Sequence, residues 1–131
     1  MKGFVGDIEM LTEGNADFRR VLYTAKHLQL VLMTLPPGEQ IGEETHADGD
    51  QFFRVEQGDG EIWIDGAATR VTAGMAMIVP AGARHNVKCT GREPLQLYTI
   101  YGPPEHLDGI VRATKSAAET AEEHFDGRTT E

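Results

Sequence analysis

The 131-residue sequence has little cysteine, few basic residues and no long hydrophobic run. Its single cysteine, Cys89, cannot form an internal disulfide, which agrees with a reducing compartment. Asp and Glu number 21 against 12 Lys and Arg, and the formal net charge of −9 repels phosphate backbones and anionic lipid. We therefore expect no nucleic-acid partner and no membrane partner.

No apolar segment is long enough to cross a bilayer, and the first ten residues lack the apolar stretch of a signal peptide. These absences predict a cytoplasmic protein. The length suits one ordinary domain, and 40% hydrophobic with 25% charged residues is typical of globular proteins. We expect one core.

Apolar residues recur with a period of two along most of the chain, and Gly and Pro interrupt the pattern at short intervals. On this basis strands are predicted at residues 18–24, 27–35, 51–57, 61–65, 75–80, 85–89 and 95–101. The first two flank a two-residue connection and could pair as a hairpin. Many short strands without intervening helices are typical of an all-β sandwich, barrel or jelly roll.

The end of the chain departs from this pattern. Residues 114–125 are rich in Ala and Glu and precede Asp126-Gly127, which predicts either a short acidic helix that ends there or a frayed tail. The last five residues, GRTTE, are expected to be disordered. We thus divide the chain into residues 1–113, a barrel with its N-terminal strands, and residues 114–131, a C-terminal helix and tail.

Side chains that can bind a metal ion are concentrated in ETHADGDQ. On an extended strand Glu44 and His46 share a face, so both can meet one cation. Residues 47–50 are turn-forming and return the chain to Gln51, which leads a row of apolar, inward-facing residues. A polar side chain in that position needs a partner, and a metal ion is one.

A fourth candidate ligand, His85, follows the rigid turn at Pro80 and Gly82. A lone histidine is more often structural than a ligand, so the case depends on the joint spacing. Two alternatives stay open. Glu44 could be a solvated strand-end carboxylate, and Gln51 could hydrogen-bond to a bound water instead of the ion.

The spacing resembles the two motifs of the cupin family. The first motif is present as Gly38, Glu44, His46, Gln51 and Gly58. The second is present as Gly74, Pro80, Gly82, His85 and Cys89. The resemblance implies a double-stranded β-helix, the cupin jelly-roll barrel. It also implies one divalent metal ion, Zn, Mn, Fe or Ni, held by Glu44, His46, Gln51 and His85.

Three positions depart from the family pattern. Glu44 replaces the first His, Gln51 replaces the Glu, and Cys89 replaces the final Asn. The first two exchanges compensate, because the usual quartet and this one each carry a single negative charge. We expect Cys89 to be a small buried side chain.

The resemblance implies a small-molecule substrate and leaves three functions open. The first is a Lewis-acid isomerase or lyase acting on a sugar or hydroxy-carbonyl compound. From Lys26 to Tyr101 the chain resembles the small single-domain relatives of zinc-dependent phosphomannose isomerases. The second is a non-haem iron oxygenase, whose two-His, one-carboxylate triad Glu44, His46 and His85 resemble. The third is a non-catalytic metal-binding or ligand-binding protein.

Further residues are candidates to line the barrel mouth, although aromatic residues on strands are usually core. They are His27, Trp63, Tyr98 and Tyr101. His106 and His124, near the end of the chain, are expected to be exposed. The apolar outer positions and the family's habit predict a homodimer.

Overall fold

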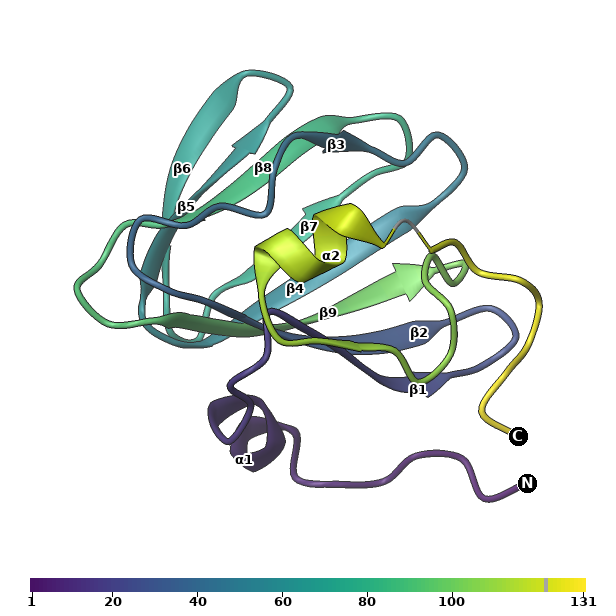
Figure 1. The fold of residues 1–131 in the computed structure, drawn as a ribbon. Coiled ribbons are helices and arrows are strands. Elements are labelled where there is room, and N and C mark those ends of the chain that lie inside the picture. Colours follow the sequence, from purple (N-terminus) through teal and green to yellow (C-terminus); the bar gives the residue numbers. More distant parts are fainter. Residues whose placement is uncertain (122) are drawn as a thin grey trace.

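The computed structural model describes residues 1–121 and 123–131, and within them the chain is predominantly β-structure (Figure 1). The strands are β1 (Arg19–Thr24), β2 (Gln29–Leu35), β3 (Glu44–Thr45), β4 (Asp50–Gln57), β5 (Asp59–Ile64), β6 (Ala67–Thr72), β7 (Ala76–Val79), β8 (Arg84–Cys89), β9 (Leu95–Gly102) and β10 (Val111–Arg112). The helices are α1 (Ile8–Glu13) and α2 (Lys115–Thr120). None of these helices is long and apolar enough to cross a membrane.

Two antiparallel sheets pack face to face as a jelly roll. The larger has the strand order β10-β1-β2-β9-β4-β7, and the smaller has the order β3-β8-β5-β6. Burial alternates along β4, β8 and β9, so one row of side chains from each strand enters the space between the sheets. This space is the core, and the all-β jelly roll expected from the sequence is confirmed.

The strands predicted from apolar alternation are present, and the predicted hairpin forms between β1 and β2. β6 and β10 were not predicted. β6 reads AATRVT and buries only Val71, so it lacks the alternation on which strand prediction depends. Cys89 is fully buried, as expected, and its thiol donates to the Glu93 carbonyl.

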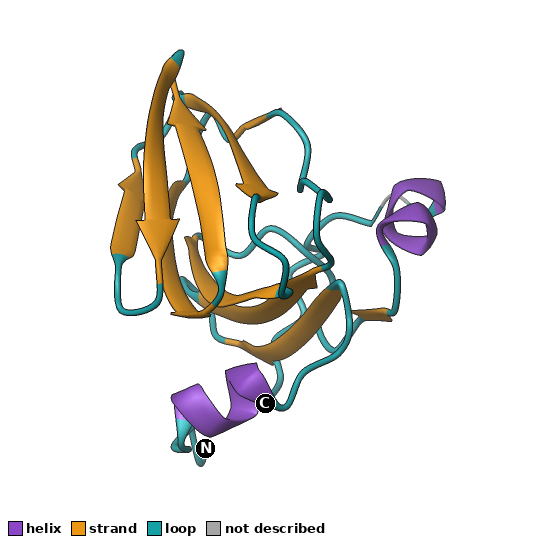
Figure 2. Cartoon of the chain, turned by 90° about the vertical axis from the view of Figure 1, so that its left-hand side faces the viewer, coloured by secondary structure: helices purple, strands orange, loops and turns teal. Residues whose placement is uncertain are grey.

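The two helices also differ from expectation. α1 was not predicted, and it begins at Asp7, whose carboxylate accepts from the Met10 amide at 3.0 Å. The predicted helix over residues 114–125 is shorter, since α2 covers only Lys115–Thr120 with Thr114 as its N-cap. Figure 2 shows α2 outside the two sheets and joined to them by loops, and its Ala118 packs against the core.

The expectation that the last five residues are disordered is wrong. Thr130 donates its backbone amide to the Thr24 carbonyl at 2.9 Å, and its hydroxyl accepts from the Thr24 amide at 2.8 Å. The Glu131 carboxylate accepts from the Tyr23 hydroxyl and from the Lys2 amide. The end of the chain is therefore bonded to β1, although its polar sequence carries no hydrophobic signal for this.

The glycine before β5 occupies a crowded turn. Gly58 has φ +95°, and a Cβ atom built there would lie 2.5 Å from the Pro94 carbonyl oxygen. Gly74, in the turn before β7, has a similar φ of +92° but open space where a Cβ would lie. The first position thus requires glycine for space as well as for backbone conformation.

Candidate metal centre

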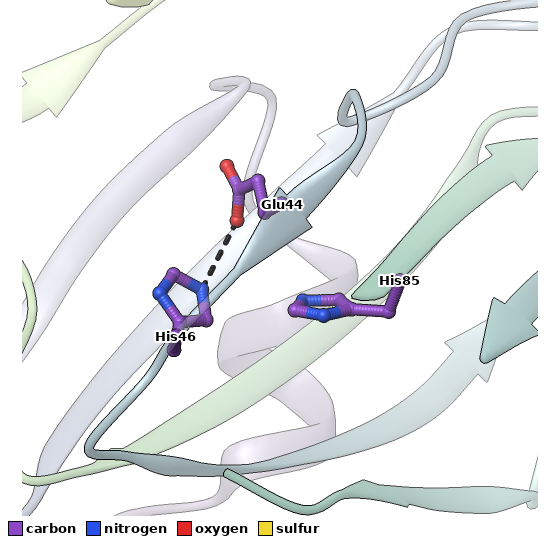
Figure 3. A group of neighbouring side chains, drawn as sticks. All are labelled: Glu44, His46 and His85. Atoms are coloured by element: carbon purple, nitrogen blue, oxygen red, sulfur yellow. Dashed lines mark hydrogen bonds and ion pairs between the residues drawn. The ribbon is translucent and has the colours of Figure 1, made fainter. Parts of the chain in front are cut away.

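Glu44, His46 and His85 converge between the sheets at the open end of the jelly roll (Figure 3). Glu44 lies on β3, directly opposite His85 on β8 in the antiparallel register, and His46 follows β3 by one residue. One donor atom from each lies within 4.8 Å of the others. A short strand pair therefore brings together residues that the sequence separates by about forty positions.

Gln51 reaches the same place from the opposite sheet. It is 3% exposed on β4, and its amide oxygen lies 3.1 Å from Nε2 of His85. The Gln51 amide nitrogen donates to the Thr99 hydroxyl at 2.9 Å, and that hydroxyl donates to the Phe52 carbonyl at 2.8 Å. Because the Thr99 proton is already used, Thr99 accepts from Gln51, which turns the Gln51 oxygen toward the cluster.

Both ring nitrogens of His85 face an oxygen that can only accept. Nδ1 lies 3.1 Å from the Ala83 carbonyl oxygen, and Nε2 lies 3.1 Å from the Gln51 amide oxygen. A neutral imidazole has a single N–H and can donate to only one of these two oxygens. With that hydrogen on Nδ1, the Nε2 lone pair and the Gln51 oxygen can both bind one cation. The donor set therefore fits a divalent metal ion.

His46 lies between two carboxylates. Its Nδ1 is 3.4 Å from Glu105 Oε1, and its Nε2 is 3.2 Å from Glu44 Oε2. The hydrogen bond to Glu105, followed by that to Glu44, raises the pKa of His46 to about 9, against the effect of burial. Burial alone would raise the pKa of Glu44, but the hydrogen bond and charge of His46 hold it below its usual value. A carboxylate on Nδ1 orients an imidazole whose Nε2 binds metal, and Glu105 is in that position.

The loop after β9 contributes residues that sequence reasoning missed. Buried Gln29 on β2 holds this loop, because its amide oxygen accepts from the backbone amides of Glu105 at 3.1 Å and His106 at 2.9 Å. His106 is half-buried, not exposed, and its Nε2 lies 3.3 Å from the Tyr101 hydroxyl. Burial, and then the charge of Arg19, lowers the pKa of His106 to about 3, so its ring is neutral. His124 is exposed as expected.

Of the residues proposed to line the mouth, the structure brings only Tyr101 to the cluster. Its ring is 4% exposed and meets His46 edge-on, with ring centroids 5.7 Å apart. His27 is exposed in the turn between β1 and β2. Tyr98 stacks with Phe52 on the outer side of β9, and Trp63 lies on the outer side of β5.

A cavity of about 190 Å³ opens beside the donor atoms. Its polar lining is Arg19, Glu44, His46, Glu105, His106 and Arg112, with Glu123 and His124 from the segment after α2. That segment is attached by an ion pair between Arg112 and Glu123. A larger hollow of about 300 Å³ lies on the outer side of β5 and β8, around Trp63 and Lys88. It holds only His85 of the candidate ligands, so the chemistry belongs to the smaller cavity.

Comparison with known proteins agrees with this geometry. The family model described as Cupin domain matches residues 31–101, more than half of the chain. The chain belongs to the cupin family. This cupin is 44% identical over 128 residues to the uncharacterized protein YrkC of Bacillus subtilis, a match that covers 93% of this chain and 69% of YrkC. The resemblance found in the two motifs is thus confirmed.

Solved structures show the same fold. A crystal structure of a Bacillus halodurans protein is 44% identical, has a TM-score of 0.90, and the match covers 92% of this cupin and 96% of that chain. KdgF from Halomonas sp. is 21% identical with a TM-score of 0.62, over 65% of this cupin and 76% of that chain. At that identity the likeness to KdgF concerns the fold alone.

Proposed function

We propose that this cupin binds one divalent metal ion through Glu44, His46, Gln51 and His85 and acts on a small hydroxy-carbonyl compound as an isomerase or lyase. The observation that carries the proposal is the 3.1 Å approach of the Gln51 amide oxygen to Nε2 of His85, beside the mutually close donor atoms of Glu44, His46 and His85. When bound, a dication with open coordination positions polarises a substrate carbonyl and acidifies the neighbouring carbon.

The chain's own residues supply the groups that can move a proton. Glu105 lines the cavity, and the hydrogen bond from His46 keeps the pKa of its carboxyl low, so it is ionised. His106 is neutral and hydrogen-bonded to Tyr101, which holds its ring against the cavity. We assign proton transfer to Glu105, with His106 and Tyr101 as positioning residues.

A non-haem iron oxygenase is the second candidate. It is supported by the mutual proximity of donor atoms from two His and one carboxylate within 4.8 Å, since such a triad is typical of non-haem iron oxygenases. Metal identity separates the two candidates, because oxygenase chemistry needs iron and dioxygen. A metal-binding protein that catalyses nothing would show neither activity.

The test begins with elemental analysis of untagged protein and continues with reconstitution by Zn, Mn, Fe or Ni. We expect one equivalent of metal per chain, and metal-dependent deuterium uptake at the carbon next to the carbonyl of hydroxy-carbonyl compounds in D2O. Glu105→Gln should abolish the uptake while keeping the metal. Glu43→Gln is the matched control, because Glu43 is exposed and paired with Arg84 outside the cavity. Oxygen consumption with iron, without exchange, would favour the second candidate.

A homodimer in the cytoplasm completes the proposal. Ile78 on the edge strand β7 is 67% exposed, and a large apolar side chain at a sheet edge is suited to an interface. Light scattering at micromolar concentration should give twice the mass of the chain. Ile78→Lys should then give the monomer mass, and a monomer in the unaltered protein would contradict the dimer.

A further inference from the structure

Arg19 projects into the mouth of the jelly roll. It precedes the core residue Val21 by two positions on β1, so the two side chains share the inner face of the sheet. Its cross-strand partner is Arg112 on β10, and residues directly opposite in a sheet also share a face. Both arginines line the 190 Å³ cavity together with Glu44 and His46.

The two arginines differ in how their charge is balanced. Arg112 is ion-paired with Glu123. Among residues 1–121 and 123–131, no carboxylate forms an ion pair with Arg19, and its buried Nε has no hydrogen-bond partner. Its guanidinium carbon lies 5.3 Å from the centre of the Phe18 ring, a cation–π contact that holds the group in place. Arg19 lies close enough to Glu44 for its charge to lower the pKa of that carboxyl, but the two form no ion pair, so an anionic ligand would supply the missing hydrogen-bond partner.

The charges around the cavity favour an anionic ligand. Within the described residues its lining has the carboxylates of Glu44, Glu105 and Glu123 and the guanidinium groups of Arg19 and Arg112. A bound dication adds two positive charges to these five groups, which leaves one net positive charge in the loaded site before the histidines are counted. A ligand with a single negative charge would neutralise it.

The size of the site suits a small molecule. The cavity of about 190 Å³ lies below the roughly 300–1,000 Å³ of pockets that hold drug-sized ligands, and a neighbouring hollow of about 340 Å³ shares Arg19 and Glu44 with it. The planar fork of a guanidinium matches a carboxylate, which it can bind through two parallel hydrogen bonds.

We propose that the substrate is a small hydroxy- or keto-carboxylate whose carboxylate is bound by Arg19. The proposal rests on the proposed function, because it names the substrate class of the same site. Arg19 thereby becomes the residue that distinguishes acids from neutral hydroxy-carbonyl compounds, while the metal ligands recognise the oxygen atoms that both classes share.

The test is calorimetric titration of zinc-reconstituted protein with lactate, with neutral dihydroxyacetone and with inorganic phosphate. We expect lactate to bind on the order of ten- to a hundredfold more weakly to Arg19→Gln than to the unaltered protein, the loss typical of a charge-assisted hydrogen bond. Dihydroxyacetone should bind both proteins alike, and phosphate should bind more weakly than lactate. Arg20→Gln is the matched control, because the neighbouring Arg20 is exposed and pairs with Asp17. It should leave lactate binding unchanged.

Zinc content is measured in every variant, which separates the two proposals. Zinc at one equivalent with equal lactate affinity in Arg19→Gln and the unaltered protein overturns the carboxylate assignment and leaves the metal site standing. Tighter binding of phosphate than of lactate overturns it as well. Protein that binds no zinc overturns both proposals. If Arg19→Gln does not fold, Arg19→Lys replaces it, and an undiminished affinity for lactate there contradicts the role of the guanidinium fork.

Discussion

The amide oxygen of Gln51 and Nε2 of His85 lie 3.1 Å apart, one from each of the two sheets. Each side chain is held by its remaining polar group, Gln51 by Thr99 and His85 by the Ala83 carbonyl. Neither can turn away without losing a buried hydrogen bond. The two ligand atoms are therefore preorganised for a cation. Each candidate ligand can be tested by its own substitution.

Glu44→Gln should weaken metal binding far more than Gln51→Ala, because the first change removes the negative charge of the quartet as well as a bond. The double change Glu44→His with Gln51→Glu should restore binding relative to Glu44→Gln, since it recreates the usual cupin quartet at the same total charge. Metal titration by calorimetry on the three variants measures this. Equal losses in the two single variants, without rescue, would place Glu44 outside the ligand set.

Thr99→Val should lower metal affinity several-fold and reduce the free energy of unfolding by about 1–3 kcal/mol, because the buried amide nitrogen of Gln51 loses its acceptor. Thr99→Ser is the matched control, since it keeps the hydroxyl. Metal titration and urea unfolding of both variants give the two quantities. If the valine and serine variants bind metal equally well, the hydroxyl does not orient Gln51.

Metal binding near neutral pH should release about one proton, because the pKa of His46 is about 9 and Nε2 must be deprotonated to bind the ion. Affinity should therefore rise by about tenfold per pH unit between pH 7 and 9 and level off above that range. Calorimetry in buffers of different ionisation enthalpy counts the protons. Glu105→Gln removes the largest cause of the raised pKa of His46. This variant should therefore release fewer protons on binding metal than the unaltered protein at the same pH. If the number of protons released on metal binding does not change with pH, His46 is not the ligand that loses a proton.

Gly58→Ala should destabilise the fold by about 1–3 kcal/mol more than Gly74→Ala. The two glycines have nearly the same positive φ, so the backbone strain of an alanine is shared, and only the first substitution places a Cβ against the Pro94 carbonyl. Thermal unfolding of the two variants isolates the steric contribution. Equal losses would mean that the turn moves away from β9 at little cost.

Part of this site could be predicted from the sequence because it follows local rules. The period of two places Gln51 and His85 on inward faces, and the structure finds both buried there. Motif spacing links Glu44 and His46 to them across intervening turns. The sequence did not single out Arg19, because a charged side chain at the start of a strand is ordinarily exposed.

Residues outside the motifs depend on contacts between distant segments. Glu105 and His106 lie in a loop without any periodic pattern, and their position depends on buried Gln29. That glutamine, the one polar residue in the apolar run LQLVLM, was a visible signal that its partner lay elsewhere in the chain. Arg112 reaches the cavity only because β10 pairs with β1 from the other end of the chain, a pairing that local patterns do not contain.

The candidate ligands come from both sheets, and this affects how the two sheets are held together. Gln51 belongs to the larger sheet, whereas Glu44 and His85 belong to the smaller one. An ion bound by all of them would act as a cross-link that ties the two layers at their open end. Removing the ion by chelation would then free the short β3 strand to fray, so amide exchange near Glu44 would report on metal occupancy from the protein backbone itself.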